Sequence, residues 1–274
     1  MSSVLVTGAS RGIGKAVTLH LAAVGWDVIA GVRRPEDAAV LEATAGVTPV
    51  ILDITDPEQV AALDEVLPAR LNAVVNNAGV VVGGPLESVS PDDLRRQLDV
   101  NVVGQLAVSQ AALPRLRESR GRIVFVSSVN GRVAAPMLGP YCASKFALEA
   151  AADALRMELR PWRIRVSVVE PAQTATDMWD SAEQTADDME ASMSPGQRVL
   201  YAKHIAGFRK MIPTSRKMAV PADKVAQVVE SALTDRRSKA RYAVGVGPRL
   251  QMAVANALPS AVSDVVLRKA FGQP

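Results

Sequence analysis

Short apolar runs rich in Val and Ile recur along the chain and alternate with longer stretches that favour helix. Most of these runs are continuously apolar, as expected of parallel strands that are buried on both faces. The predicted strands are residues 4–6, 27–32, 48–52, 73–75, 122–126, 165–169 and 241–244. The predicted helices are at about 12–24, 35–44, 57–68, 91–119 (interrupted by Pro114), 141–160 and 222–234. This alternation predicts an α/β fold: a doubly wound, mostly parallel seven-stranded sheet with helices on both faces, in a single domain over residues 1–274.

Two segments depart from this rhythm. Residues 173–220 follow the end of a strand, where ligands bind in open α/β sheets, and they carry several methionines, which adapt to irregular apolar partners. They are therefore predicted to form a substrate lid, with ordinary helical packing as the alternative. Residues 245–274 form an amphipathic C-terminal extension broken by Pro259. This extension is expected to pack over the cleft or against a partner subunit, and membrane-surface association is the alternative.

Composition describes a soluble globular protein, since 49% of the 274 residues are apolar and 22% are charged. No run reaches about 18 apolar residues, so no membrane span is predicted. The N-terminus has neither a basic region nor a cleavage site, and a cytoplasmic location is expected. His20, His204 and Cys142 are too few for a His/Cys zinc site, and no metal is predicted. Cys142 is interpreted as a small packed helical residue rather than a nucleophile.

The net charge of +3 is unevenly distributed. Residues 197–274 hold 14 Lys and Arg against 4 Asp and Glu, which gives +10 and leaves −7 for residues 1–196. A basic C-terminal third could meet an anionic substrate, an acidic carrier or a membrane surface, or it could simply form solvated faces and oligomer contacts. Nucleic-acid binding is not predicted, because the basic residues have no aromatic interleaving and no reader motif.

A tyrosine and a lysine stand four residues apart at the start of a predicted helix, and Ser128 lies thirteen residues before the tyrosine. Residues i and i+4 of a helix project from one face, so Tyr141 and Lys145 are expected side by side. A fixed cation beside a phenol favours the phenolate and is expected to lower the tyrosine pKa from about 10. A general acid/base that works near neutral pH needs such a shift.

A glycine-rich turn joins the first predicted strand to the first predicted helix. It reads Thr7-Gly8-Ala9-Ser10-Arg11-Gly12-Ile13-Gly14. Glycines allow a tight turn and close backbone approach, and the helix N-terminus offers free N–H groups to a pyrophosphate. The spacing G-x-x-x-G-x-G differs from the commoner G-x-G-x-x-G. A dinucleotide site is nevertheless favoured over an ordinary turn, because the motif stands inside a βαβ unit.

The end of the second strand has no acidic residue to bind a ribose 2′-hydroxyl, which dinucleotide folds that select NAD place there. Arg33 could instead bind a 2′-phosphate through charge-assisted hydrogen bonds, helped by Arg11. NADP(H) is therefore predicted, and NAD(H) is the weaker alternative. A solvated arginine at a turn remains an alternative for Arg34.

Together these motifs make the chain resemble the short-chain dehydrogenase/reductase family, in the form with a single Rossmann-type domain. The resemblance runs from residue 4 to about 245. It is carried by the glycine turn, Asp53, Asn76-Asn77-Ala78-Gly79, Asn101-Val102-Val103-Gly104, Ser127-Ser128, Tyr141 with Lys145, and Pro171 through Thr176.

The resemblance implies a nicotinamide cofactor site. Asp53 would meet the adenine ring, and Asn77 to Gly79 would line the adenosine side. The implied cofactor-binding set is Gly8, Ser10, Arg11, Gly12, Ile13, Gly14, Arg33, Asp53, Asn77, Ala78, Gly79, Tyr141, Lys145, Pro171 and Thr176.

The resemblance also implies a catalytic set. Tyr141 would exchange a proton with the substrate oxygen, and Ser128 would hydrogen-bond the same oxygen. Lys145 would bond the nicotinamide ribose and lower the Tyr141 pKa. Asn101 would hold a water that links Lys145 to solvent. This agrees with the chemistry, because hydride transfer to a carbonyl develops alkoxide charge that donors must stabilise.

Some of these residues have simpler alternatives. Asn101 could be a buried helix residue, Asp53 could cap the helix near Pro57, and Ser128 could satisfy a strand end. One residue departs from the family pattern: Ala172 stands where a glycine usually follows Pro171. Its methyl group could crowd the nicotinamide.

The chain is thus expected to be an NADP(H)-dependent enzyme that interconverts an alcohol and its ketone or aldehyde. The insertion and the tail resemble those of members that act on steroids, retinoids or other lipophilic compounds, so a small lipophilic substrate is expected. The alternatives are a 3-oxoacyl thioester reductase and, outside enzymes, a non-catalytic NADP(H)-sensing regulator. Small residues on helices 91–119 and 141–160 would let a partner helix approach, and a homodimer or homotetramer is expected.

Overall fold

A seven-stranded parallel sheet forms the centre of the molecule in the computed structural model, which describes residues 2–175, 182–245 and 259–274. The strand order β3-β2-β1-β4-β5-β6-β9 reverses direction at β1, so the predicted doubly wound Rossmann-type sheet is confirmed, with all seven strands parallel. The strands are β1 (Ser2–Thr7), β2 (Trp26–Val32), β3 (Val47–Ile51), β4 (Ala73–Asn76), β5 (Arg122–Val126), β6 (Arg165–Pro171) and β9 (Arg241–Val244).

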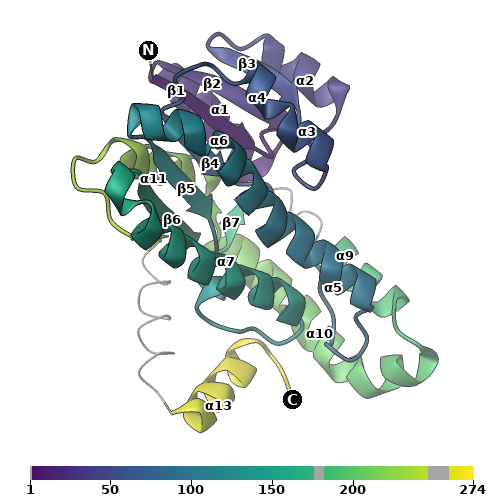
Figure 1. Ribbon diagram of the computed structural model, residues 1–274. Helices are drawn as coiled ribbons and strands as arrows, with labels where there is room; N and C mark the ends of the chain where they lie inside the picture. Colours follow the sequence, from purple (N-terminus) through teal and green to yellow (C-terminus); the bar gives the residue numbers. More distant parts are fainter. Residues whose placement is uncertain (1, 176–181, 246–258) are drawn as a thin grey trace.

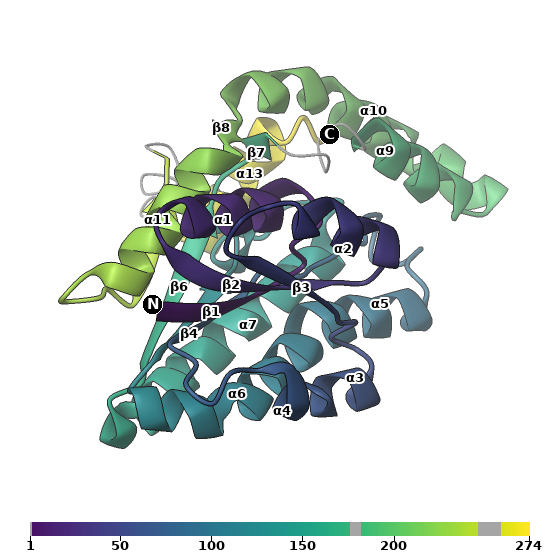
Figure 2. The same ribbon diagram turned by 90° about the horizontal axis from the view of Figure 1, so that it is seen from above.

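Helices cover both faces of this sheet (Figure 2). On one face lie α1 (Gly12–Ala23), α2 (Pro35–Glu42) and α11 (Ala222–Thr234). On the other lie α3 (Pro57–Ala61), α4 (Leu63–Val66), α6 (Gln105–Ser119) and α7 (Gly139–Glu158). In β1, Val4 and Val6 pack towards the first layer and Leu5 towards the second, and none of the three is exposed. This burial on both faces explains why the strands are continuously apolar.

The helix predicted over 91–119 is interrupted, but not at Pro114. It begins as α5 (Pro91–Leu98), passes through a π-helical segment at Asp99–Gly104 and continues as α6 straight through Pro114. A proline inside a helix costs about 3 kcal/mol, and the complete burial of Val108, Ala112 and Leu116 of α6 offsets that cost. The predicted break at Pro114 is therefore wrong. The irregular turn lies around Asn101 instead, and single-turn π segments often occur at functional sites.

Residues 173–220 begin and end at a short two-stranded parallel ladder between β7 (Thr174–Ala175) and β8 (Val220–Pro221). Between these strands lie α9 (Ala182–Ala191) and the long α10 (Pro195–Met218), which extend together beyond the sheet (Figure 1). Met189 of α9, Met193 of the connection between the two helices and Ile205 of α10 form an apolar cluster with Met137, just before α7. The insertion is thus helical and packs against the loop that leads into the Tyr141 helix.

The C-terminal residues return to this insertion. Residues 246–258 of the predicted extension lie outside the described residues, and α13 (Ser260–Ala270) follows them. A methyl group at Gly207 of α10 would overlap the backbone of Gly272, and Gln273 Nε2 donates to the carbonyl of His204 at 3.4 Å. The end of the chain therefore contacts α10. Among the described helices, none is long and apolar enough to cross a membrane.

Candidate functional site

The glycine turn has the backbone that its sequence requires. Gly8 and Gly12 adopt φ of +64° and +55°, a region that side chains with a Cβ rarely adopt. A methyl group at Gly14 would overlap the Gly8 carbonyl and lie 2.5 Å from Asn77 Nδ2. The helix start after Arg11 carries no side-chain cap, so its N–H groups are available to a ligand. The turn has the features of a cradle for a pyrophosphate.

Asn77 and Ala78 tie the end of β4 to this turn. Asn77 Nδ2 donates to the carbonyls of Thr7 and Gly8 at 3.0 and 3.2 Å. Thr7 Oγ1 accepts from the backbone N–H of Asn77 at 3.0 Å and from that of Ala78 at 3.1 Å. The predicted adenosine-side residues and the glycine turn therefore form one hydrogen-bonded unit.

Three fully buried amide side chains hold the segment after β4. Asn101 Oδ1 accepts from Val80 N–H at 2.9 Å, and its Nδ2 donates to the Val80 carbonyl and to Ser144 Oγ, both at 3.0 Å. Gln97 accepts from Val82 N–H at 2.6 Å and donates to the Val80 carbonyl at 2.8 Å. Gln105 donates to the Ala78 carbonyl at 2.7 Å.

Sequence reasoning found Asn101 and missed Gln97 and Gln105. Their spacing could have identified them, since Gln97, Asn101 and Gln105 stand four residues apart and therefore share one face of the predicted helix. Asn101 also bonds to α7 through Ser144. Its buried structural role is therefore observed, and a water-holding role would come in addition to it.

Ser128, Tyr141 and Lys145 come together where β5 ends and α7 begins. Lys145 is buried, and its Nζ donates to the Val126 carbonyl at 2.8 Å and lies 5.8 Å from the centroid of the Tyr141 ring. Ser128 Oγ accepts from Asn130 N–H at 3.1 Å and so caps the short turn after β5. Its hydroxyl also interacts with the Tyr141 side chain. The predicted serine, tyrosine and lysine thus form one cluster.

The electrostatics of this cluster differ from the expectation. Burial raises the pKa of Tyr141 to about 12, and the Ser128 hydroxyl opposes this rise. Burial also lowers the pKa of Lys145 to about 8, and the charge of Glu149 opposes that fall. The chain by itself therefore does not lower the tyrosine pKa, since the same burial disfavours both the phenolate and the ammonium. At neutral pH Tyr141 holds its proton.

The end of β2 presents one paired arginine and one unpaired arginine. Arg34 Nε pairs with Asp37 Oδ2 at 2.9 Å, which accounts for it structurally. Arg33 is exposed, and its guanidinium, like that of Arg11, makes no hydrogen bond or ion pair with the rest of the described chain. Arg33 and Arg11 are thus the cations at this strand end that a ligand can engage.

Asp53 lies in the loop after β3. Its carboxylate accepts from Thr55 N–H at 2.9 Å and from Thr55 Oγ1 at 2.7 Å. Burial raises the pKa of Asp53, but these hydrogen bonds and the charge of Arg33 outweigh that effect and leave the pKa below its ordinary value. The helix at Pro57 is capped by Asp56, so the alternative that Asp53 is its cap is wrong.

Cys142 is buried on α7, and its Sγ accepts from the backbone N–H of Ala135 at 3.3 Å. Burial raises the pKa of its thiol. It is a packed thiol rather than a reactive thiolate. Within the described ranges, no three His, Cys, Asp or Glu side chains are grouped to hold a metal ion.

Comparison with known proteins agrees with this geometry. The sequence profile of the short chain dehydrogenases matches residues 2–187. The chain belongs to the short-chain dehydrogenase/reductase family. Retinol dehydrogenase 5 of Mus musculus is 35% identical over 285 residues, which cover 99% of this chain and 89% of that protein. The NADPH-dependent 3-dehydrocapnine reductase of Ornithobacterium rhinotracheale is 32% identical, with 98% and 97% covered. A solved short-chain dehydrogenase from Burkholderia cenocepacia in complex with NADP has a TM-score of 0.74 at 27% identity, covering 100% of this chain and 98% of that chain.

One of the expected family contacts, Pro171, lies at the end of β6. Pro171 is the last residue of this strand and is buried, and Ala172 N–H donates to the Val244 carbonyl at 3.5 Å. Thr176, the last member of the expected cofactor set, lies outside the described residues. This short-chain dehydrogenase/reductase therefore keeps its glycine turn, amide-held loop and serine–tyrosine–lysine cluster on adjoining strand ends.

Proposed function

We propose that this oxidoreductase uses NADP(H) to interconvert an alcohol and its ketone or aldehyde. The observation that supports this most directly is the cluster of Ser128, Tyr141 and Lys145 beside the glycine turn. The cofactor, when bound, would supply or accept the hydride. Gly8, Gly12, Gly14 and the start of α1 fit its pyrophosphate, because positive φ at Gly8 and Gly12 and the close packing of Gly8 and Gly14 allow a tight turn before uncapped helix N–H groups.

The protein side chains would handle the substrate oxygen. With a pKa of about 12, Tyr141 keeps its proton at neutral pH and would release it only as negative charge develops on that oxygen. Ser128 would donate a hydrogen bond to the same oxygen. Lys145, with a pKa of about 8, is mostly protonated at neutral pH and would stabilise the phenolate that remains. This arrangement suits carbonyl reduction.

Two further features support the finer assignments. The exposed, unpaired Arg33 favours NADP(H), since a guanidinium binds a 2′-phosphate well. The buried cluster of Met137, Met189, Met193 and Ile205 holds the insertion next to the start of α7, and the partly buried Leu138, Tyr201 and Phe208 around it favour a lipophilic substrate. The retinol dehydrogenase among the relatives points to the same class.

The test is NADPH oxidation by the purified protein with a panel of carbonyl substrates. The panel holds steroid and retinoid carbonyls, small polar ketones and a 3-oxoacyl thioester. Tyr141→Phe is expected to abolish turnover while NADPH still binds in a calorimetric titration. Tyr242→Phe is the control, because this buried tyrosine lies on β9 and bonds to Asp235 instead.

The outcomes separate the candidates. Activity confined to the thioester would favour the 3-oxoacyl thioester reductase, and activity confined to small polar ketones would exclude the lipophilic class. NADPH binding without turnover of any substrate would leave the cofactor-sensing regulator. Equal turnover by wild type and Tyr141→Phe would remove Tyr141 from the mechanism.

A further inference from the structure

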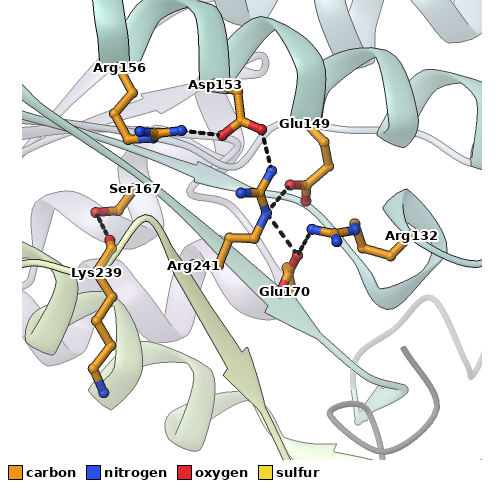
Figure 3. A network of polar contacts seen from close by, with 8 residues as sticks. All are labelled: Arg132, Glu149, Asp153, Arg156, Ser167, Glu170, Lys239 and Arg241. Carbon is orange, nitrogen blue, oxygen red and sulfur yellow. Dashed lines mark hydrogen bonds and ion pairs between the residues drawn. The ribbon is translucent and has the colours of Figure 1, made fainter. Parts of the chain in front are cut away.

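A network of charged side chains joins α7 to β6 and β9 (Figure 3). Glu149 stands one helical turn after Lys145 on α7, and Glu170 is the last residue but one of β6. Their side chains are only 6% and 3% exposed. Carboxylates this deeply buried are rare unless cations compensate them.

Arg241 of β9 supplies most of this compensation. Its Nε lies 3.0 Å from Glu149 Oε2, and its Nη2 lies 2.6 Å from Asp153 Oδ2. Glu170 is held more loosely, with Oε1 at 3.5 Å from Arg241 and 3.8 Å from Arg132. One arginine therefore fixes Glu149 firmly and leaves Glu170 at longer range.

Glu149 is also wedged against the turn after β5. A methyl group at Gly131 would lie 2.8 Å from Ser127 Oγ and 3.0 Å from Glu149 Cγ. The Ser127 hydroxyl lowers the pKa of Glu149, although Ser127 Oγ and Glu149 Oε1 are not aligned for a full hydrogen bond. The carboxylate thus has little freedom to move away from Lys145.

The titratable and charged groups on this side of Lys145 come from several elements. Tyr141 and Glu149 share its helix, Glu170 comes from β6, Arg241 from β9, and Arg132 follows the turn after β5. Burial lowers the pKa of Lys145, and the charge of Glu149 is what opposes that fall. Burial raises the pKa of Glu149 itself, and Arg241 and Arg132 counteract the rise.

We propose that Glu149 is a positioning residue for Lys145, whose buried carboxylate, clamped by Arg241, keeps the lysine side chain in its ammonium form beside Tyr141. The role of Lys145 in turnover rests on the proposed function, whereas its protonation state does not. Asp153 shares the Arg241 clamp but stands two turns beyond Lys145, and it does not act on the charge of Lys145. It provides a matched comparison.

The first test is the pH profile of NADPH-dependent turnover. An alkaline limb near pH 8 is expected as Lys145 loses its proton. Glu149→Gln is expected to move this limb to lower pH by about 0.5 to 2 units, the order of effect that Coulomb's law gives for one unit charge on a partly buried neighbouring group. Asp153→Asn is expected to leave the limb in place, and Glu149→Asp, which keeps the charge, is expected to restore it.

The second test needs neither cofactor nor turnover. The ε-carbon of Lys145 is titrated by NMR in the cofactor-free protein with ¹³C-labelled lysine, and Lys145→Met identifies the signal. The titration is expected to move to lower pH in Glu149→Gln and to stay in place in Asp153→Asn. An unmoved Lys145 titration in folded Glu149→Gln overturns the proposal.

If Glu149→Gln does not fold, Glu149→Met takes its place. That change removes the same negative charge and keeps a side chain of similar length, so the lysine titration is expected to move the same way. An unmoved titration there overturns the proposal equally. Absence of wild-type turnover would count against the proposed function only, because the NMR titration would still decide the role of Glu149.

Discussion

Gly8→Ala should damage the glycine turn through two separable effects. The first is conformational, because Gly8 adopts φ +64°, and an L side chain in that region costs about 1–2 kcal/mol. The second is steric, because the new Cβ would lie 2.9 Å from Ala78 Cα and 3.2 Å from Ala78 N. These are backbone atoms that hydrogen bonds to Thr7 hold in place, and overpacking of this kind costs about 1–3 kcal/mol. The total loss in the free energy of unfolding should be about 2–5 kcal/mol.

Gly25→Ala isolates the conformational part. Gly25 adopts φ +89°, and a Cβ there meets nothing within 4 Å. Chemical denaturation of both variants should therefore show Gly8→Ala as the less stable by about 1–3 kcal/mol, the steric part alone. Only Gly8→Ala should also weaken NADPH binding in a calorimetric titration. If both variants lost the same stability and kept wild-type NADPH affinity, the close approach of Gly8 to Ala78 would contribute neither to the free energy of unfolding nor to cofactor binding.

Two further predictions concern charge. Arg33→Ala should raise the NADPH dissociation constant roughly 10- to 100-fold through the loss of a charge-assisted hydrogen bond and leave NADH binding unchanged. Arg34→Ala is the control and should change neither affinity, because Arg34 already pairs with Asp37. Equal losses of NADPH and NADH affinity in Arg33→Ala would refute a 2′-phosphate site. Glu170 has a pKa raised from about 4.5 to about 7, chiefly by burial, so its contribution to stability is complete below about pH 4.5 and is lost as the pH rises through 7. Wild type should therefore lose up to about 3 kcal/mol relative to Glu170→Gln between pH 5 and pH 8 in denaturant titrations, and a difference that does not change with pH would contradict the buried, weakly compensated carboxyl.

The sheet was predictable because its signal is local and repeated. Most strands are continuous apolar runs, and Val4, Leu5 and Val6 of β1 are completely buried on both faces. The interruption near Asn101 was not predictable in the same way. Proline carries a strong helix-breaking signal, so Pro114 drew the prediction, whereas the π-helical segment depends on side-chain amides bonding to the distant segment 78–82.

In the candidate site, too, features set by local sequence were predicted and features set by distant contacts were not. Spacing along α7 brought Tyr141 and Lys145 together correctly, since i and i+4 share a helix face. The sign of the tyrosine pKa shift did not follow from spacing, because it depends on burial by elements far away in the sequence. The hydrogen-bonded ion pair between Arg241 and Glu149 was not predicted either, because the two residues stand 92 positions apart along the chain.

The most direct test of hydride transfer is the fate of deuterium in a single turnover. NADPH that carries deuterium on the transferable position of nicotinamide C4 is incubated with the enzyme and a lipophilic ketone, and the product alcohol is examined by mass spectrometry. One deuterium on the former carbonyl carbon is the predicted result for wild type, and no product should form with Tyr141→Phe. An alcohol product without deuterium, or labelled product at wild-type yield from Tyr141→Phe, would contradict the account.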